Sequence, residues 1–306
     1  MGVIYHSEPK LNNPVMLACW PGIGEIGVMA AGILRRSAGA HEFAEIEPYQ
    51  FFYPKRVFIR GGELKEMEFP ASKFYYSDSG PRHVVIFIGE EQPSENGRRY
   101  AEGSKAYQMA NLVLDVATKL GCSLVFTSGA AVAPTHHTLT PRVWAVPNSE
   151  ELVQQVRSYE NTILMSDLED REGRGHITGM NGLLLGVARK RGLDAVCLMG
   201  EVPAYLQGFP LPYPKASKVV LGVLGRVLGT NIDLRQMDAF IENTQNQVEA
   251  LYQSFPPQIR EQLDKLKQLQ PSSGESARTG APITEEDKKR IMEDIDKMFK
   301  KEPKGD

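Results

Sequence analysis

The chain has 306 residues, of which 42% are hydrophobic and 24% charged, and its formal net charge at pH 7 is -3. This composition is typical of an ordinary globular protein, and it gives no basic patch of the kind that nucleic acid requires. No apolar run approaches the roughly 18 residues of a membrane-spanning helix. Met1 to Lys10 also lack the basic and then apolar pattern of a signal peptide. We therefore expect a cytoplasmic protein that binds neither nucleic acid nor a membrane.

A glycine-rich turn stands between the first predicted strand and the first predicted helix. The apolar run Val15 to Trp20 is followed by Pro21-Gly22-Ile23-Gly24-Glu25-Ile26-Gly27 and then by a helical segment, Val28 to Arg36. Glycines allow positive φ and close approach of backbone N–H groups, and the start of a helix favours an anion. The spacing fits a dinucleotide site, but a predicted β-hairpin replaces the second crossover helix, and Glu25 has the wrong charge for a pyrophosphate. We expect no cofactor and interpret the turn as a tight strand-to-helix connection.

The next part of the chain, up to residue 230, alternates predicted strands and helices, with one interruption. Between residues 51 and 77, aromatic and β-branched segments around Gly61-Gly62 predict a β-hairpin or meander. Elsewhere, His41 to Glu47 alternates apolar and polar residues, and His83 to Gly89 is a nearly continuous apolar run, which is typical of a strand buried on both faces. The strands expected outside the hairpin are His41 to Glu47, His83 to Gly89, Cys122 to Gly129, Val143 to Val146 and Asp194 to Gly200. The helices expected are Arg98 to Leu120, a short one after Ser149, Leu183 to Arg191 and Lys215 to Leu228. The pattern predicts an α/β core domain over residues 1–230.

The C-terminal part has a different character. Apolar residues recur at helical spacing on both sides of Pro256-Pro257, which predicts a helical hairpin over residues 231–270, packed on the core or on another subunit. Residues 271–282 are rich in Ser, Gly and Pro and are expected to form a flexible linker. Residues 283–306 are expected to form an amphipathic tail helix. Its apolar stripe gives the candidate partner-binding residues Ile291, Ile295, Met298 and Phe299.

Several candidate site residues stand at the carboxyl ends of predicted strands, where ligands bind in open α/β sheets. The candidates for a ligand crevice are Gly22, Gly24, Glu25, Glu90, Ser128, Asn181, Glu201 and Tyr205. Ser128 lacks the Gly-x-Ser-x-Gly turn of a hydrolase. We expect adjacent histidines at 136 and 137 to point apart, with no third metal ligand at a usable spacing. The sequence therefore predicts no catalytic residue and no metal site. The alternative is an enzyme of ligase or hydrolase type that binds an anionic or nucleotide ligand, with Glu90 and Glu201 as acid/base or metal candidates.

Four blocks of sequence, in this order, resemble the proteasome assembly chaperone 2 family. They are the glycine-rich turn; Thr127 to Pro134 with Pro141 to Val146; Gly179 to Gly186; and Gly200 to Tyr205 with Pro214 and Ala216. Together they lie within about residues 14 to 255. The resemblance implies a three-layer α/β/α domain of the phosphorylase/hydrolase-like kind with a central mixed sheet. It also implies homo-oligomerisation and a non-catalytic role in assembling a protein partner, with proteasome subunits as the candidate.

The resemblance has two departures. Members are sometimes labelled ATP-grasp-like, yet a lysine-bearing glycine-rich loop and paired metal carboxylates cannot be placed in this chain. Relatives are also implied to dock on the proteasome through a C-terminal hydrophobic-Tyr-any tail, whereas this sequence ends Lys304-Gly305-Asp306. We therefore expect the tail helix to provide the partner-binding surface instead, by laying its apolar stripe in a groove.

Overall fold

The computed structural model describes residues 2–94, 101–164 and 176–268. The strands are β1 Val3–Tyr5, β2 Val15–Cys19, β3 His41–Ile46, β4 Arg56–Arg60, β5 Glu63–Glu68, β6 Ser72–Ser77, β7 Val84–Gly89, β8 Leu124–Ala133, β9 Val143–Pro147, β10 Thr162–Leu164 and β11 Ala195–Pro203. The helices are α1 Ile26–Ser37, α2 Gly103–Lys119, α3 Glu150–Arg157, α4 Gly179–Lys190, α5 Pro214–Leu228, α6 Asp238–Ser254 and α7 Pro257–Lys265. Within these residues, no helix is both long and apolar enough to cross a bilayer.

A nine-stranded mixed sheet forms the centre of the molecule, in the order β1-β3-β6-β7-β2-β8-β11-β9-β10. Strands β7, β2, β8 and β11 pair in parallel. Antiparallel pairs extend this parallel centre on both sides, through β6 against β7 and β9 against β11. The mixed sheet that was expected is therefore confirmed.

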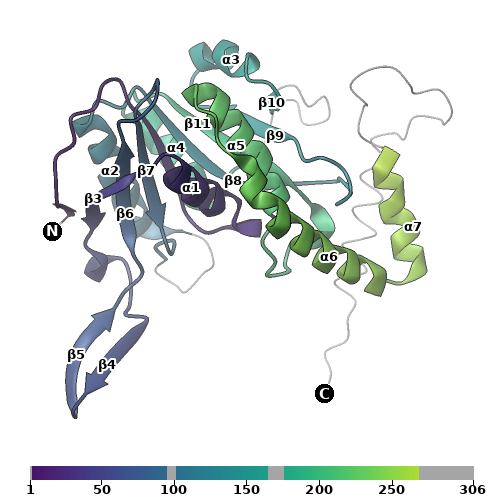
Figure 1. The fold of residues 1–306 in the computed structure, drawn as a ribbon, viewed down its shortest axis with the longest axis horizontal. Helices are drawn as coiled ribbons and strands as arrows, with labels where there is room; N and C mark the ends of the chain where they lie inside the picture. The colour runs from purple at the N-terminus through teal and green to yellow at the C-terminus, as the bar shows by residue number, and fades with distance from the viewer. Residues whose placement is uncertain (1, 95–100, 165–175, 269–306) are drawn as a thin grey trace.

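Helices cover both faces of the sheet (Figure 1). In β2, Val15, Leu17 and Cys19 pack in one core with side chains of α1 and α5, whereas Met16 and Ala18 pack in the other with side chains of α2 and α4. Successive side chains of a strand point to opposite faces, so a strand buried on both sides must be apolar throughout. The three-layer α/β/α architecture is confirmed.

The strands β8 and β11 are longer than the sequence predicts. They stay paired from Ala195–Val125 to Pro203–Ala133, so Gly129 and Gly200 lie inside strands and do not end them. A Cβ on Gly200 would lie 2.9 Å from the Cβ of Ala216 in α5, and one on Gly129 would lie 2.5 Å from Nδ2 of Asn181 in α4. These glycines therefore let helices approach the sheet closely, which is a packing role and not a turn.

The predicted hairpin between residues 51 and 77 divides into two parts. Strand β6 joins the main sheet between β3 and β7, whereas β4 and β5 form a separate two-stranded sheet. This small sheet projects from the body as an isolated arm (Figure 1). Gly61 and Gly62, with φ of 63° and 81°, make its turn.

Helices α6 and α7 end the described part of the chain. They are separated at Pro256, as the sequence predicts. Val248 and Tyr252 of α6 and Leu263 of α7 are buried in the same core as α5, so both helices pack on this chain's own α/β body. The polar stretch Asp167 to Gly175, the expected linker and the expected tail helix with Ile291, Ile295, Met298 and Phe299 lie outside the described residues.

Candidate functional site

A cavity of about 500 Å³ opens at the carboxyl ends of β2 and β8. Gly22 and Ile23 follow β2, residues 129–132 form the second half of β8, and Asn181 belongs to the first turn of α4. The chain leaves β2 toward β3 on one side of the sheet and leaves β8 toward β9 on the other. Such a switch point is where open α/β sheets bind ligands, so this cavity is the candidate crevice.

Of the eight crevice candidates, the structure brings Gly22 and Asn181 to this cavity. The side-chain amide of Asn181 is already engaged: Nδ2 donates to the carbonyl of Ser128 at 3.0 Å, and the hydroxyl of Thr127 donates to Oδ1. Asn181 therefore ties α4 to β8, and its hydrogen-bonding groups are directed into the protein.

Gln92 lines the cavity and was not among the candidates from the sequence. Its Nε2 donates to the carbonyl of Pro21 at 2.6 Å, and its Oε1 accepts from the backbone N–H groups of Ala101 at 3.0 Å and Met180 at 3.1 Å. One side chain thus joins the glycine-rich turn to the starts of α2 and α4. The available signal was its position shortly after β7, at the same edge of the sheet as the other candidates.

The glycine-rich turn is filled by the protein's own groups. Gly24 and Glu25 have φ of 64° and 53°, and the carbonyl of Gly24 accepts from the N–H of Tyr213 at 2.8 Å. A Cβ on Gly27 would lie 2.2 Å from the carbonyl oxygen of Ser128, so α1 contacts β8 backbone to backbone. Only glycine permits this approach.

Glu201 is fully buried in a set of charge-assisted hydrogen bonds and does not line the cavity. Its carboxylate accepts from Nη2 of Arg142 at 2.8 Å, from the backbone N–H of Arg142 at 2.9 Å and from Nε1 of Trp144 at 2.8 Å. Arg142 and Trp144 stand in a block that was noted for its resemblance alone, since no local pattern pairs them with Glu201. Ser128 is also fully buried, and its hydroxyl has no hydrogen-bond partner among the described residues.

Glu90 lies at the base of the β4–β5 arm and not at the cavity. Its Oε2 accepts from Nζ of Lys55 at 2.7 Å and from the N–H of Ala71 at 3.0 Å. Partial burial raises the pKa of Glu90, but these two contacts outweigh it and hold the pKa below its ordinary value. This carboxylate is therefore a structural anchor for the arm.

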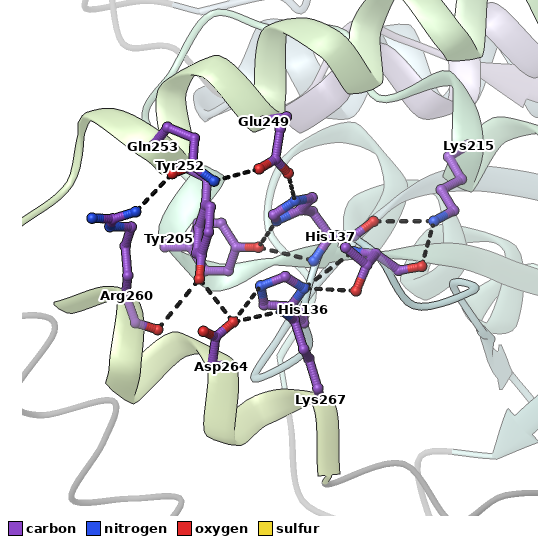
Figure 2. A network of polar contacts seen from close by, with 11 residues as sticks. His136, His137, Tyr205, Lys215, Glu249, Tyr252, Gln253, Arg260, Asp264 and Lys267 are labelled. Carbon is purple, nitrogen blue, oxygen red and sulfur yellow. Dashed lines mark hydrogen bonds and ion pairs between the residues drawn. The ribbon is translucent and has the colours of Figure 1, made fainter. Parts of the chain in front are cut away.

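A buried histidine pair forms a second polar centre, between the loop after β8 and helices α6 and α7 (Figure 2). His136 and His137 are 1% and 2% exposed, and their ring centroids lie 4.2 Å apart. The expectation that adjacent histidines point apart is wrong here. That rule holds for an extended strand, and the loop turns both rings to the same side, where Tyr205 and Tyr252 pack against them.

The hydrogen bonds of His137 assign its proton. The hydroxyl of Tyr205 accepts from the backbone N–H of His137 at 2.8 Å, and it lies 2.6 Å from Nδ1. Since that hydroxyl donates to Nδ1, the ring proton is on Nε2, which donates to Oε2 of Glu249 in α6 at 2.9 Å. Tyr205 lies beneath this network and is 2% exposed. It does not line the strand-end cavity.

Both histidines are held neutral. Burial lowers the pKa of His136 to about 4, with the neighbouring His137 acting in the same direction. Burial also lowers the pKa of His137, although its hydrogen bond with Glu249 opposes the shift. Protonation of both rings would place two like charges in contact, which adds to the cost of burying either charge.

Side chains of α6 and α7 close this centre from outside. Nε2 of Gln253 donates to Glu249 at 2.6 Å, Nη1 of Arg260 donates to Gln253 at 2.7 Å, and the hydroxyl of Tyr252 donates to Asp264 at 2.8 Å. Asp264 in turn lies 3.7 Å from Nε2 of His136. A cavity of about 400 Å³ remains between these groups.

One cluster has the spacing of a metal site within the part of the chain that the structure describes. The ligand atoms of His6, Glu42 and Glu45 lie within 4.8 Å of one another, on the exposed side of β3. Among the described residues, the histidine pair does not form such a cluster. Exposed carboxylates near a histidine are common without an ion, so β3 is not assigned a metal.

Comparison with known proteins identifies relatives over most of the chain. The PAC2 family model matches residues 16–252. An uncharacterized protein of Methanocaldococcus jannaschii is 25% identical over 273 residues, which cover 89% of this chain and 93% of that protein.

Solved structures show the same fold. PbaB of Pyrococcus furiosus, an archaeal proteasome activator, is 27% identical with a TM-score of 0.67, over 81% of this chain and 97% of that chain. A PAC2 family protein of Streptomyces avermitilis has a TM-score of 0.61 at 24% identity, over 79% of this chain and 97% of that chain. Since the family match spans well over half of the sequence, this chain belongs to the PAC2 family.

Proposed function

We propose that this protein is a non-catalytic, self-associating chaperone-like member of its family that binds a protein partner and assists its assembly. The observation that carries the proposal is the likeness to PbaB, which extends over nearly all of that proteasome activator. Proteasome subunits are therefore the first partner to test. The cytoplasm is the proposed compartment, in keeping with free cysteines at positions 19, 122 and 197.

The geometry at the strand ends supports a non-catalytic role. An enzyme needs a nucleophile, base or metal ligand that faces its substrate. Here Glu201 is fully buried against Arg142 and Trp144, and Glu90 anchors the β4–β5 arm. Asn181 is bonded to β8. Neither carboxylate lines the cavity, and among the described residues its one titratable lining side chain is His176.

We place partner binding on the expected tail helix, through Ile291, Ile295, Met298 and Phe299. The sequence supports this placement, because these residues form one apolar stripe beyond the Ser-, Gly- and Pro-rich segment 271–282. An amphipathic helix on a tether can enter a hydrophobic groove of another protein. The proposal divides the rest of the chain into a core domain, residues 1–230, and a helical hairpin, residues 231–270.

The test is purification of the tagged full-length protein from its native host, beside a version truncated after Leu269 and a variant with Ile295→Asp and Met298→Asp. Mass spectrometry should find proteasome subunits, or one dominant protein, with the full-length chain. Truncation and substitution should both remove it. A clean homo-oligomer without a partner in all three samples contradicts the proposal.

Small-ligand binding is the second candidate, and the cavity of about 500 Å³ favours it. A thermal-shift screen with nucleotides and small carboxylates distinguishes the two functions, since a ligand that binds the folded state raises the melting temperature. The chaperone-like function predicts no shift. A shift that is lost in Asn181→Ala, with the fold retained, would favour the ligand-binding function instead.

A further inference from the structure

The β4–β5 arm exposes nearly all of its residues. Every residue of β4 is exposed, and in β5 Glu68 alone is half-buried. Within the described chain, β4 pairs with β5 and with no other strand. Isolated two-stranded sheets are marginally stable in water, and apolar side chains on them are usually covered. The arm therefore has the features of an element that is completed by something outside this chain.

One face of the arm is apolar. Val57 pairs with Met67, and Ile59 pairs with Leu64. Lys65 has no partner in β4, so the register shifts by one residue between these two pairs. Alternate residues of a strand point to the same face, and so do residues that pair directly across two strands. Leu64 and Met67 would otherwise point to opposite faces, but the extra residue Lys65 between them brings all four apolar side chains to one side. They are 46%, 46%, 68% and 62% exposed in the order given.

The two edges of the arm carry opposite charges. Strand β4 has Arg56 and Arg60 and no acid, whereas β5 has three glutamates and Lys65. Within the arm, Arg56 stands opposite Glu68 and Arg60 opposite Glu63, and Nε of Arg56 lies 3.2 Å from the Glu68 carboxylate. Arginine across from glutamate stabilises a strand pair, and like charges across from each other destabilise it.

We propose that the arm is the subunit interface of a cyclic homo-oligomer, in which β5 of one copy pairs with β4 of the next copy. This inference rests on the self-association included in the proposed function. Head-to-tail pairing repeats between copies the same arginine–glutamate pattern that already stabilises the arm within one copy. The apolar faces then line the inside of the shared sheet.

The charges select this arrangement over a two-fold dimer. A symmetric β4–β4 pair centred on Phe58 places Arg56 of one copy opposite Arg60 of the other, twice. A symmetric β5–β5 pair that places Leu64 opposite Met67 faces Glu63 of one copy with Glu68 of the other, twice, and faces Lys65 with Glu66. Only the β5–β4 contact joins an acidic edge to a basic edge. Because this contact uses two different surfaces, it forms rings of three or more subunits and not dimers.

Native mass spectrometry of the purified full-length protein tests the proposal. The wild type should have a mass of at least three times 34.0 kDa. Ile59→Asp with Leu64→Asp should weaken subunit association by about a hundredfold or more, because it places charges in the buried face. The matched control is Tyr107→Asp, which changes a similarly exposed side chain on α2 and should keep the wild-type mass. None of the substituted arm residues belongs to either buried core, so melting temperatures should stay close to that of the wild-type subunit.

Charge reversal tests the pairing itself. Arg56→Glu with Arg60→Glu makes both edges acidic, and Glu63→Arg with Glu68→Arg makes both edges basic, so each variant alone should dissociate. All four substitutions in one chain exchange the charges of the two strands, restore opposite charges within and between arms, and should restore the wild-type mass for any number of subunits. Dimers as the largest species, or arm variants with the wild-type mass, overturn the interface while leaving self-association intact. A monomeric wild type overturns both, whereas failure to recover a protein partner overturns the chaperone role alone.

Discussion

Nε2 of His137 donates to Oε2 of Glu249 across 2.9 Å, and this bond joins the loop after β8 to helix α6. The two residues are 112 positions apart in the sequence. His137 is fully enclosed, whereas the Glu249 side chain is 49% exposed, so the bond runs from the interior of the body to the inner side of the helix. It attaches α6 to the body through a buried imidazole.

Glu249→Ala should destabilise the attachment of α6. The substitution leaves the buried Nε2–H of His137 without an acceptor, and a buried unsatisfied donor costs about 1–3 kcal/mol. Urea unfolding should show this loss, and hydrogen exchange should be faster in α6 and α7 than in the central sheet. Glu242→Ala, at an exposed position of the same helix, is the control and should change stability by no more than about 0.5 kcal/mol. Equal effects of the two substitutions would contradict the assigned role.

Stability should fall as the pH is lowered from about 6.5 toward 4. An unfolded histidine has a pKa near 6.5, and burial lowers the folded pKa of His136 to about 4 and that of His137 in the same direction. In this window the unfolded chain takes up protons that the folded chain does not, which favours unfolding. Each histidine contributes a slope of about 1.4 kcal/mol per pH unit at most.

The groups around the pair fix how this prediction is checked. Glu249 and Asp264 face the rings from α6 and α7, and Lys215 and Lys267 oppose them with positive charge. The two carboxylates have lowered pKa values themselves, so their own contribution is lost at lower pH than that of the histidines. Urea midpoints measured from pH 8 to pH 4 should fall less steeply after His136→Gln with His137→Gln. An unchanged slope would refute the prediction.

Local sequence was enough to predict an α/β sheet that is buried on both faces, whereas the three layers were implied by the resemblance to the family. Strands such as β2 and β7 are apolar at nearly every position because both faces are covered, and this pattern is visible in a few consecutive residues. Pro256 and the glycines at 61 and 62 act through their own backbone geometry, so the helix break and the hairpin turn were predictable as well.

The topology predicts a crevice at the strand ends, but not the contacts of the candidate residues. Of the residues that the strand-end rule selects, Gly22 lines the cavity. The rule cannot say that Glu201 turns inward, since the reason is an arginine 59 residues earlier in the chain. It also cannot predict the histidine pair, because the rings are oriented by Tyr205 and by a helix that follows much later.

Arg142→Ala should cost more stability than Glu201→Gln. Removing the arginine leaves a fully buried carboxylate without its positive partner, and breaking a buried ion pair in this way typically costs about 3–5 kcal/mol. Because the arginine side chain is 35% exposed, we expect the lower end of that range. Glu201→Gln removes the buried charge and keeps an acceptor for Nε1 of Trp144, so about 1 kcal/mol is expected. Chemical unfolding of both variants gives the comparison, and the reverse order would contradict the structural role of Glu201.

Substitution by alanine should have very different effects on stability at two glycines of the same turn. At Gly22 the backbone is extended, with φ of -161°, and an added Cβ meets nothing within 4 Å, so Gly22→Ala should change stability by about 0.5 kcal/mol or less. At Gly27 an added Cβ would lie 2.2 Å from the carbonyl oxygen of Ser128, and α1 would have to move away from β8. Gly27→Ala should therefore destabilise the fold by about 3 kcal/mol.

This pair of variants separates the two interpretations of the turn. If the glycines only let α1 pack on the sheet, melting temperature and partner recovery should both be unchanged in Gly22→Ala, and both should fall in Gly27→Ala. Gly22 lines the strand-end cavity, so a turn that held a ligand there would show a further effect in Gly22→Ala. In that case Gly22→Ala would keep the wild-type melting temperature of the free protein and lose the ligand-induced shift. Thermal unfolding of both variants with and without the screened ligands decides between packing and binding.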